Sequence, residues 1–481
     1  MSAAVRPMRR GPTLVADAFI TIATRFGLAV LIFSTDIVLA HLLGPSAKGR
    51  FTLVLLFSQF AALLVGWGMD SALGVVAGRD APSARAGFAN AVVWSAVVGG
   101  FSVVLTGVLY GLPTDVRPHG PLASVVPNLS AAQFTYAALA IPGELFFSIG
   151  LFALLGRRQI AAYSAIRLLR RMLLLVGVVG AALIASLSLD VALIVNLATL
   201  VLTAVAIWWF ARRDGVAGLR PSAELLGEEL RFGGRAILGT VAERLQFRAD
   251  SFIVNAFIGV HATGIYSVTS GLAETLWYVP NALGTVMFSR AVDPKADAGR
   301  IAAVLTRTTI AVALVTAVPA FILGPRLVRL VYGSQFSDAG VALRLILPGI
   351  VAYSVVAVLS RYIVGRGRPG IGTLVLMIGL GLNIVANLIL VPRFGINGAA
   401  ASSSISYGLT AVVTLFVFRR LSGRGIAETL VIRQSDVRAL IAMLGAVAGR
   451  LRGQRTGPFG LRGGETAAEL VIGEREPGEE P

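Results

Sequence analysis

The stretch that decides the fold lies at residues 235–290 and reads RAILGTVAERLQFRADSFIVNAFIGVHATGIYSVTSGLAETLWYVPNALGTVMFSR. It predicts two long apolar helices joined by a tight turn at Gly259–Gly264. The first of these helices nevertheless carries four ionisable residues within eight positions, namely Glu243, Arg244, Arg248 and Asp250. Ionisable side chains in a membrane-spanning helix are costly, and they are a functional-site hypothesis by default. They either line a pathway or tie helices together.

Composition places the whole chain in a membrane. The 481 residues are 56% hydrophobic and only 14% charged, whereas an ordinary globular chain has about 25% charged residues. The net charge of +17 would indicate nucleic acid in a soluble protein, but here arginine-rich loops between apolar runs indicate the positive-inside rule. We therefore expect a lipid bilayer as partner and no nucleic acid.

Apolar runs of about 20 residues predict transmembrane helices. Twelve are predicted, at 14–40, 51–77, 88–111, 131–155, 166–186, 190–210, 234–258, 265–289, 301–324, 341–364, 370–391 and 398–418. The first is interpreted as an uncleaved span. Loops on the side of the N-terminus hold most of the arginine, as at Arg157–Arg158 and Arg419–Arg420, so both termini are expected in the cytoplasm.

Two motifs recur in the two halves of the chain. Residues 36–51 and 250–266 both show an acidic residue, an apolar stretch, Gly, four residues, Gly, one residue and an aromatic. LLGRRQ at 154–159 and IVGRGR at 363–368 form a second pair. An even number of helices per half predicts two parallel six-helix repeats, with any substrate site between them. The predicted fold class is an all-α, polytopic, two-lobed bundle of about 12 helices with a central cavity.

These repeats set the predicted domain boundaries. An N-terminal lobe at 1–212 and a C-terminal lobe at 232–420 flank a cytoplasmic linker at 213–231. SAELLGEELR in this linker predicts a short surface helix with Ser222 as its cap, although a linker without further role stays open. In the tail at 421–481, the apolar run 437–449 is too short to cross about 30 Å of hydrocarbon. We expect a short interfacial helix followed by a disordered end.

Helical spacing groups the charged residues of the spans. Arg25 and Asp36 share one face of the first helix, and Glu243 and Asp250 share one face of the seventh. Next to the latter face runs a stripe formed by Arg244, Arg248, Ser251 and Asn255. Such stripes must face protein or water. Mutual neutralisation, for example Arg248 with neighbours of Asp250 or Arg25 with Glu243, stays open beside a cavity-lining role. Glu274, about ten residues into its span, is a further candidate.

No motif predicts catalysis, a metal or a cofactor. Gly365-Arg-Gly367-Arg-Pro-Gly370 matches a dinucleotide pattern, but no βαβ unit surrounds it, so we interpret it as a turn with Pro369 starting the next helix. Without cysteine, thiol catalysis and disulfides are excluded. His41, His119 and His261 fall in predicted loops far apart in sequence, which argues against a histidine metal cluster. We predict that the chain is not an enzyme.

Four stretches carry a resemblance to a known family. They are IVLAHLLGPSAKGRFTLVLLF, RADSFIVNAFIGVHATGIYSV, LVRLVYGSQFSDAGVALRLILPG and GRGRPGIGTLVLMIGLGLNIVANLILVPRFGINGAAASSSISYGL. They resemble the polysaccharide and O-antigen flippases of the multidrug/oligosaccharidyl-lipid/polysaccharide exporter superfamily, over about 14–420. The resemblance implies alternating-access transport of polyprenyl-pyrophosphate-linked oligosaccharides from the inner to the outer leaflet of the cell membrane, with polysaccharide polymerases and glycosyltransferases as further partners.

Roles for the candidate residues follow from that cargo. Guanidinium groups bind phosphate in a bidentate manner, so Arg25, Arg244 and Arg248, with Asn255, are predicted to bind the substrate. Asp36, Glu243, Asp250 and Glu274 are predicted to balance the cavity charge or carry a coupling ion. One alternative is a multidrug/cation antiporter of the same superfamily, whose cavity would be dominated by carboxylates and aromatics. Another is a membrane-embedded polymerase or glycosyltransferase.

Overall fold

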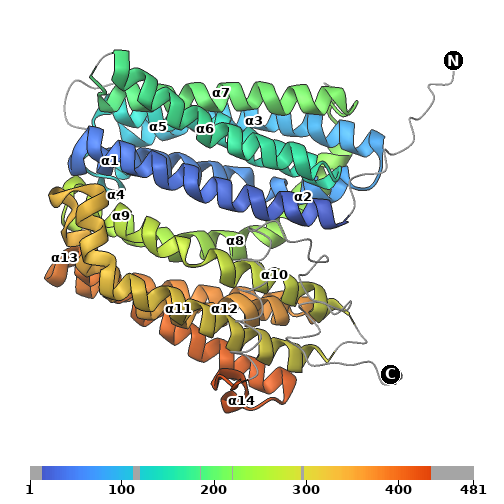
Figure 1. Cartoon of the computed structure of the whole chain (residues 1–481). Helices are drawn as coiled ribbons and strands as arrows, with labels where there is room; N and C mark the ends of the chain where they lie inside the picture. Colours follow the sequence, from blue (N-terminus) through green and yellow to red (C-terminus); the bar gives the residue numbers. More distant parts are fainter. Residues whose placement is uncertain (1–13, 112–119, 185, 219, 294–296, 435–481) are drawn as a thin grey trace. The chain divides into compact units, whose positions relative to one another are not determined.

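Every regular element in the described part of this computed structural model is a helix (Figure 1). The structure describes residues 14–111, 120–184, 186–218, 220–293 and 297–434. The helices are α1 (Leu14–Gly66), α2 (Met69–Ala77), α3 (Ala81–Tyr110), α4 (Pro121–Val125), α5 (Ala131–Gly156), α6 (Ile160–Ile184), α7 (Leu189–Arg213), α8 (Ala223–Phe257), α9 (Val260–Thr275), α10 (Tyr278–Val292), α11 (Ala298–Tyr332), the 3₁₀ turn η1 (Ser334–Phe336), α12 (Asp338–Gly365), α13 (Pro369–Ser422) and α14 (Ile426–Leu430). The apolar run 437–449 and the expected disordered end lie outside the described residues.

The apolar runs account for most of these helices. Seven segments of the described chain are long and apolar enough to cross a membrane. Two of them, in α1 and α13, continue through a kink at a glycine from one predicted span into the next. α13 holds both 370–391 and 398–418, whereas the predicted span 51–77 is interrupted at Trp67–Gly68 and is completed by α2. Gly44 has φ 69° and Gly395 has φ 59°, a left-handed conformation that glycine adopts without penalty. The remaining predicted spans lie in α6, α8 and α9–α10, which carry ionisable residues or are interrupted.

The turn inside residues 235–290 is shorter than the sequence predicts. α8 ends at Phe257 and α9 begins at Val260, so only Ile258 and Gly259 form the turn and Gly264 lies inside α9. The second predicted helix of this stretch is also not continuous, since it breaks between Thr275 and Tyr278. Pro280 has no backbone N–H to donate into the preceding turn, which is a local cause for the break.

Two further predictions need correction. The sequence predicts a separate short helix at 222–231, but these residues are the first turns of α8, which continues to Phe257. Ser222 does cap this helix, accepting a hydrogen bond from the amide of Leu225 at 3.3 Å. His41 and His261 lie inside α1 and α9 and not in loops. Helix α1 continues past the end of the predicted span at residue 40, and α9 begins at Val260, directly after Gly259 and before the predicted span at 265. His119 lies outside the described residues.

The chain forms two compact units. Unit 1 comprises the described residues up to Arg244 together with Ser251–Val268 and Val331–Gln335; unit 2 comprises Leu245–Asp250, Thr269–Leu330 and the described residues from Phe336 onward. α8 thus contributes one short segment, 245–250, to unit 2 and the rest of its length to unit 1. The predicted lobe boundaries at 212 and 232 stay a prediction.

Unit 1 is a bundle in which α5 contacts α1, α2, α3 and α7, while α6 packs on α1 and α7. Figure 1 shows α1, α3, α5, α6 and α7 running side by side. One buried apolar cluster includes Met69, Leu73, Phe88, Ile141 and Ile207, and a second includes Leu53, Tyr110, Phe134, Leu174 and Leu193. In unit 2, α12 packs against both α10 and α13, and α14 follows α13.

The two copies of the repeat motif meet inside unit 1. Gly49 of α1 and Gly264 of α9 occupy the same place in the two motifs, and their backbones are in close contact. A Cβ on Gly49 would lie 2.9 Å from the amide nitrogen of Gly264 and would overlap the carbonyl oxygen of Val260. A Cβ on Gly264 would likewise overlap the carbonyl oxygen of Pro45. Neither position therefore accepts a side chain without movement of the backbone.

Gly49→Ala is expected to destabilise unit 1 by about 1–3 kcal/mol, the usual effect of overpacking a tight contact. Thermal unfolding of the detergent-solubilised protein measures this. The matched control is Gly100→Ala in α3, where the space around the glycine is open and alanine favours the helix by up to about 1 kcal/mol. Equal transition temperatures for the two variants would contradict the close contact of the repeats.

Candidate functional site

Three of the predicted site residues come together in unit 2. Arg248 and Asp250 lie on the short segment of α8 that belongs to this unit, and Glu274 lies in the last turn of α9. Arg248 Nη2 donates to Glu274 Oε2 at 2.7 Å, and each side chain is 31% exposed. Arg248 therefore pairs with Glu274, not with a neighbour of Asp250.

Asp250 is the buried carboxylate of this group. Its exposed fraction is 1%, and Oδ2 accepts a hydrogen bond from the Ser403 hydroxyl of α13 at 3.2 Å. The same side of α13 presents a row of buried polar residues: Asn383, Asn387, Ser402, Ser403, Ser406, Thr410 and Thr414. Asn383 donates to Ser406 at 3.2 Å, which joins the two halves of α13 as helix-bridging polar residues do in membranes.

Four aromatic rings pack together beside the carboxylates. Phe247, Trp277, Tyr353 and Tyr407 come from α8, from the break between α9 and α10, from α12 and from α13. All six pairs of their centroids lie between 4.5 and 6.0 Å apart. Such tilted and edge-on pairs are favourable aromatic arrangements, so the cluster fixes the end of α9 on which Glu274 sits.

A small cavity opens between these groups. Its walls include Asp250, Glu274, Phe247, Trp277 and Tyr407, and the enclosed space is about the size of a single water molecule. Ligand sites for organic molecules usually measure about 300–1,000 Å³, so this space suits water or an ion better than an organic cargo. Two carboxylates and several ring faces attract cations, while the guanidinium of Arg248 attracts anions. The hydrogen-bonded pair of Arg248 and Glu274 thus presents one group that attracts anions and one that attracts cations.

Sequence reasoning missed several residues of this site. Tyr353, Tyr407, Gln246 and Ser403 were not among the predicted site residues. Gln246 is fully buried, and its Nε2 lies 3.4 Å from the Thr410 hydroxyl. The spacing of Ser402, Ser403, Ser406, Thr410 and Thr414 on one helical face is visible in the sequence, and it is the signal that predicts a polar face on this span.

The other predicted residues lie in unit 1, where Asp36 has an unexpected partner. Lys48 Nζ lies 2.7 Å from Asp36 Oδ1 and donates to the Ser267 hydroxyl at 2.6 Å. The sequence places Lys48 in an exposed loop, but α1 resumes at Pro45 and Lys48 is only 1% exposed. This contact links both repeats, because Asp36 and Lys48 belong to the first motif and Ser267 follows the second.

Glu243, Arg244 and Asn255 also lie in the part of α8 that belongs to unit 1. Arg244 is exposed and Glu243 half-buried. Asn255 is fully buried and donates to the carbonyl of Pro127 at 2.8 Å, so it ties α8 to the segment after α4. Arg25 lies in α1, but its side chain is outside the described part. Substrate and ion roles for all eight residues stay predictions.

Unit 1 also contains a buried ion pair between two membrane helices. Glu144 of α5 is 6% exposed and forms a two-point pair with Arg170 of α6, with Nη1 to Oε2 at 2.9 Å. The guanidinium also stacks over the Phe147 ring at 4.3 Å. The pair holds two membrane helices together, so its clearest role is structural.

Comparison with known proteins identifies the family. The sequence pattern of the family described as polysaccharide biosynthesis protein matches residues 38–340. The chain belongs to this family. Its members' shared pattern covers most of the first copy of the repeat motif, all of the second copy, and the segment of α8 with Arg248 and Asp250. The predicted resemblance to polysaccharide flippases is confirmed.

The chain is also similar to a protein described as a probable flippase. It is 24% identical over 294 residues to the probable low-salt glycan biosynthesis flippase Agl15 of Haloferax volcanii, covering 58% of this chain and 59% of that protein. The chain thus spans less than two thirds of the length of this relative.

Solved structures show the same fold. The lipid II flippase MurJ in an inward closed conformation matches with TM-score 0.70 and 14% identity, over 92% of this chain and 94% of MurJ. An inward-facing multidrug resistance transporter of the MATE family and MOP superfamily matches with TM-score 0.65 and 16% identity, over 82% and 94%. The predicted all-α, polytopic fold class is confirmed. The chain is a multi-pass membrane protein.

Proposed function

We propose that this protein is a flippase that moves a polyprenyl-pyrophosphate-linked oligosaccharide from the cytoplasmic to the outer leaflet by alternating access, for cell-surface polysaccharide synthesis. Family membership and the flippase named among its relatives support this. The single observation in the structure that carries it is the Arg248–Glu274 pair. It places a partly exposed guanidinium, the preferred ligand of a pyrophosphate, on α8 within the predicted span 234–258.

The pairing of Arg248 with Glu274 favours an exchange of partners during transport. A pyrophosphate that binds Arg248 competes with Glu274 for the same guanidinium. The released carboxylate then needs another positive charge, because an uncompensated charge away from water is strongly unfavourable. A proton or small cation in the adjoining cavity fits that need. Glu274, with Asp250 beside it, would in this way couple an ion to the release of cargo.

A second candidate function has one observation in its favour. Two carboxylates and three aromatic rings line the unit 2 cavity, as a cation antiporter requires. The cavity is, however, smaller than an organic cation needs, and Arg248 repels such a cation. We therefore favour an inorganic ion or proton for this cavity and an anionic cargo for the protein.

The proposed location is the cell membrane, with both termini in the cytoplasm and polysaccharide polymerase and glycosyltransferases as neighbours in the same synthesis. A deletion strain tests the function. Polyprenyl-linked repeat units are expected to accumulate on the cytoplasmic face, and the surface polysaccharide is expected to disappear. Normal surface polysaccharide in that strain would refute the proposal, and altered resistance to cationic drugs alone would favour the antiporter.

A further inference from the structure

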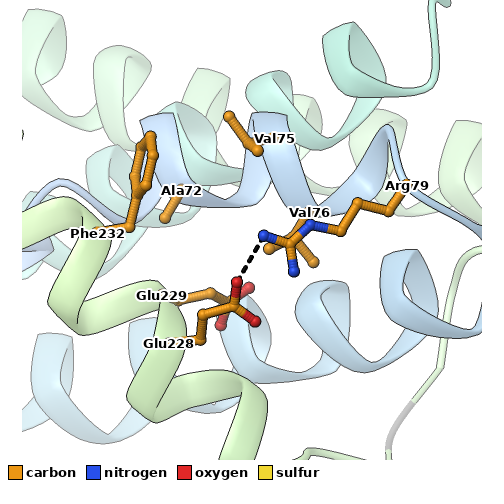
Figure 2. A pocket seen from close by; sticks show the side chains of 7 residues that line it. All are labelled: Ala72, Val75, Val76, Arg79, Glu228, Glu229 and Phe232. Carbon is orange, nitrogen blue, oxygen red and sulfur yellow. Dashed lines mark hydrogen bonds and ion pairs between the residues drawn. The ribbon is translucent and has the colours of Figure 1, made fainter.

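A second buried carboxyl group lies in unit 1, at the start of α8. Glu229 is fully buried and lines a cavity of about 180 Å³ (Figure 2). The walls are Ala72, Val75 and Val76 of α2 and Phe232 of α8, with Arg79 and Glu228 at the rim. Glu229 itself lies outside the candidate spans of the described chain, whereas α3, which packs against it, is one of them. The place is separate from the residues assigned to transport above.

The two oxygens of Glu229 have unequal surroundings. Oε2 accepts a hydrogen bond from Nδ2 of Asn90 in α3 at 3.0 Å. Oε1 is buried, and no described atom forms a hydrogen bond with it. Gly87 of α3 leaves the space for this oxygen, since a Cβ there would lie 2.8 Å from Oε1. A buried carboxylate normally has its lone pairs satisfied, so the arrangement suits a carboxyl that binds a proton.

Nearby charges do not compensate an ionised Glu229. The charged groups that face it within the described chain are Arg79, from the turn after α2, and Glu228, its neighbour on α8; α2 and α3 present apolar residues, Gly87 and Asn90. Arg79 is engaged by Glu228, with Nη2 to Oε1 at 2.5 Å (Figure 2). Burial, with a smaller contribution from the charge of Glu228, raises the pKa of Glu229 to about 7.

The amide that holds Glu229 also holds the beginning of α8. Asn90 Nδ2 donates to the carbonyl of Ser222 at 3.1 Å, and Asn90 Oδ1 accepts from the Ser222 amide at 2.9 Å. Ser222 is the cap of α8. One buried side chain of α3 therefore connects the carboxyl group and the helix cap, and a change at Glu229 acts on the docking of the whole first turn.

We propose that Glu229 is a proton-binding site that controls how firmly the start of α8 is docked on α2 and α3. The free oxygen Oε1 is closed off from solvent and lies against Gly87 of α3, which leaves no space for an organic ligand, so the ligand is a proton. With the proton bound, Glu229 is neutral and its burial is inexpensive. Without the proton, Glu229 is a buried carboxylate with a single neutral hydrogen-bond donor, Asn90, which is unfavourable. The fraction of molecules in which the start of α8 is undocked and Glu229 is exposed to water then increases.

The direction of the pH effect follows from linkage. The pKa of Glu229 is about 7 when docked and 4.5 in water, so the docked form binds more protons between these values. Docking is therefore strongest at low pH and weakens as pH rises through this window, with no further change above it. Between pH 5 and pH 8, the undocking equilibrium constant is expected to rise roughly tenfold to a hundredfold.

Hydrogen–deuterium exchange of the full-length protein in lipid nanodiscs tests this, with rates corrected for the intrinsic effect of pH. Amides at the start of α8, including those of Ser222 and Leu226, are the reporters. The wild type is expected to lose protection roughly tenfold to a hundredfold from pH 5 to pH 8. Glu229→Gln should keep the high protection at both pH values, because its side chain is neutral and of the same shape.

The matched control is Glu224→Gln, which removes an exposed carboxylate from the first turn of α8, outside the surroundings of Glu229, and should retain the pH dependence of the wild type. Protection that does not change with pH in the wild type would overturn the proposal. So would an equal loss of protection in Glu229→Gln. Recovery of protection at pH 8 by sodium chloride but not by choline chloride would also overturn it, because the ligand would then be a metal cation.

Discussion

Glu144→Ala is expected to destabilise unit 1 by about 3–5 kcal/mol, because it leaves the partner guanidinium of Arg170 buried without its counter-charge. The pair is bidentate, and the side chains of Glu144 and Arg170 are 7% and 12% exposed. Water replaces the lost carboxylate poorly at such a position. Thermal or denaturant unfolding of the solubilised protein, followed by tryptophan fluorescence, measures the effect.

An exposed pair in the same unit provides the control for this experiment. Arg79 and Glu228 are each 45% exposed, and exposed pairs contribute at most about 1 kcal/mol. Glu228→Ala should therefore change stability little. The double variant Glu144→Leu/Arg170→Leu is expected to recover most of the loss, since replacing both buried charges with apolar groups is often neutral. A Glu144→Ala protein as stable as Glu228→Ala would show that the buried pair is not structural.

Arg248→Ala is expected to reduce flipping about tenfold to a hundredfold, which corresponds to loss of a charge-assisted hydrogen bond of about 1.5–3 kcal/mol. The guanidinium is half-exposed and already positioned by Glu274, so its removal should affect cargo binding more than folding. Arg248→Lys keeps the charge but loses the bidentate geometry and should give an intermediate rate. Transport by purified protein in liposomes measures the three rates.

A double variant separates cargo binding from simple charge balance. If Arg248 only neutralises Glu274, then Arg248→Gln/Glu274→Gln removes both charges and should transport as well as the wild type. If Arg248 binds the pyrophosphate, the double variant should bind cargo as weakly as Arg248→Ala, whereas Glu274→Gln alone, which removes only the proposed coupling carboxylate, should keep cargo binding. Protein levels in the membrane and unfolding temperatures serve as the check on folding in each case. Full transport by the double variant would assign the pair a structural role.

Much of the fold follows from local features of the sequence. Apolar runs and glycine–proline pairs locate the helices, and the Gly365–Gly370 segment is a turn followed by a helix starting at Pro369, as predicted. The repeat motif is visible as spacing alone. The close approach of Gly49 to Gly264 is not visible, because it depends on which helices pack together. The predicted helix ends near Gly259 differ from the observed ones because a hydropathy average over many residues does not resolve a turn of only two residues.

The candidate site was predictable only for its charged members. Arg248, Asp250 and Glu274 are conspicuous because ionisable residues are rare in apolar helices. Their pairing was not predictable, since Arg248 and Glu274 lie 26 positions apart in sequence and several carboxylates compete for each arginine. Tyr353 and Tyr407 are ordinary aromatics in a membrane helix until packing brings them together. Lys48 was assigned to a loop because a kinked helix and a loop have the same composition.

The central claim is that this chain moves a lipid-linked oligosaccharide between leaflets and uses Arg248 to hold its pyrophosphate. The most direct test reconstitutes purified protein into liposomes that contain a fluorescent polyprenyl-pyrophosphate oligosaccharide in both leaflets. External, membrane-impermeant quencher then reports which molecules reach the outer surface. Wild-type protein is expected to make the inner-leaflet pool accessible, and Arg248→Ala protein is expected to do so about tenfold to a hundredfold more slowly. Two results would contradict the account. Liposomes with the wild type could show quenching of the outer-leaflet lipid alone, or the wild type and Arg248→Ala could show equal rates of quenching.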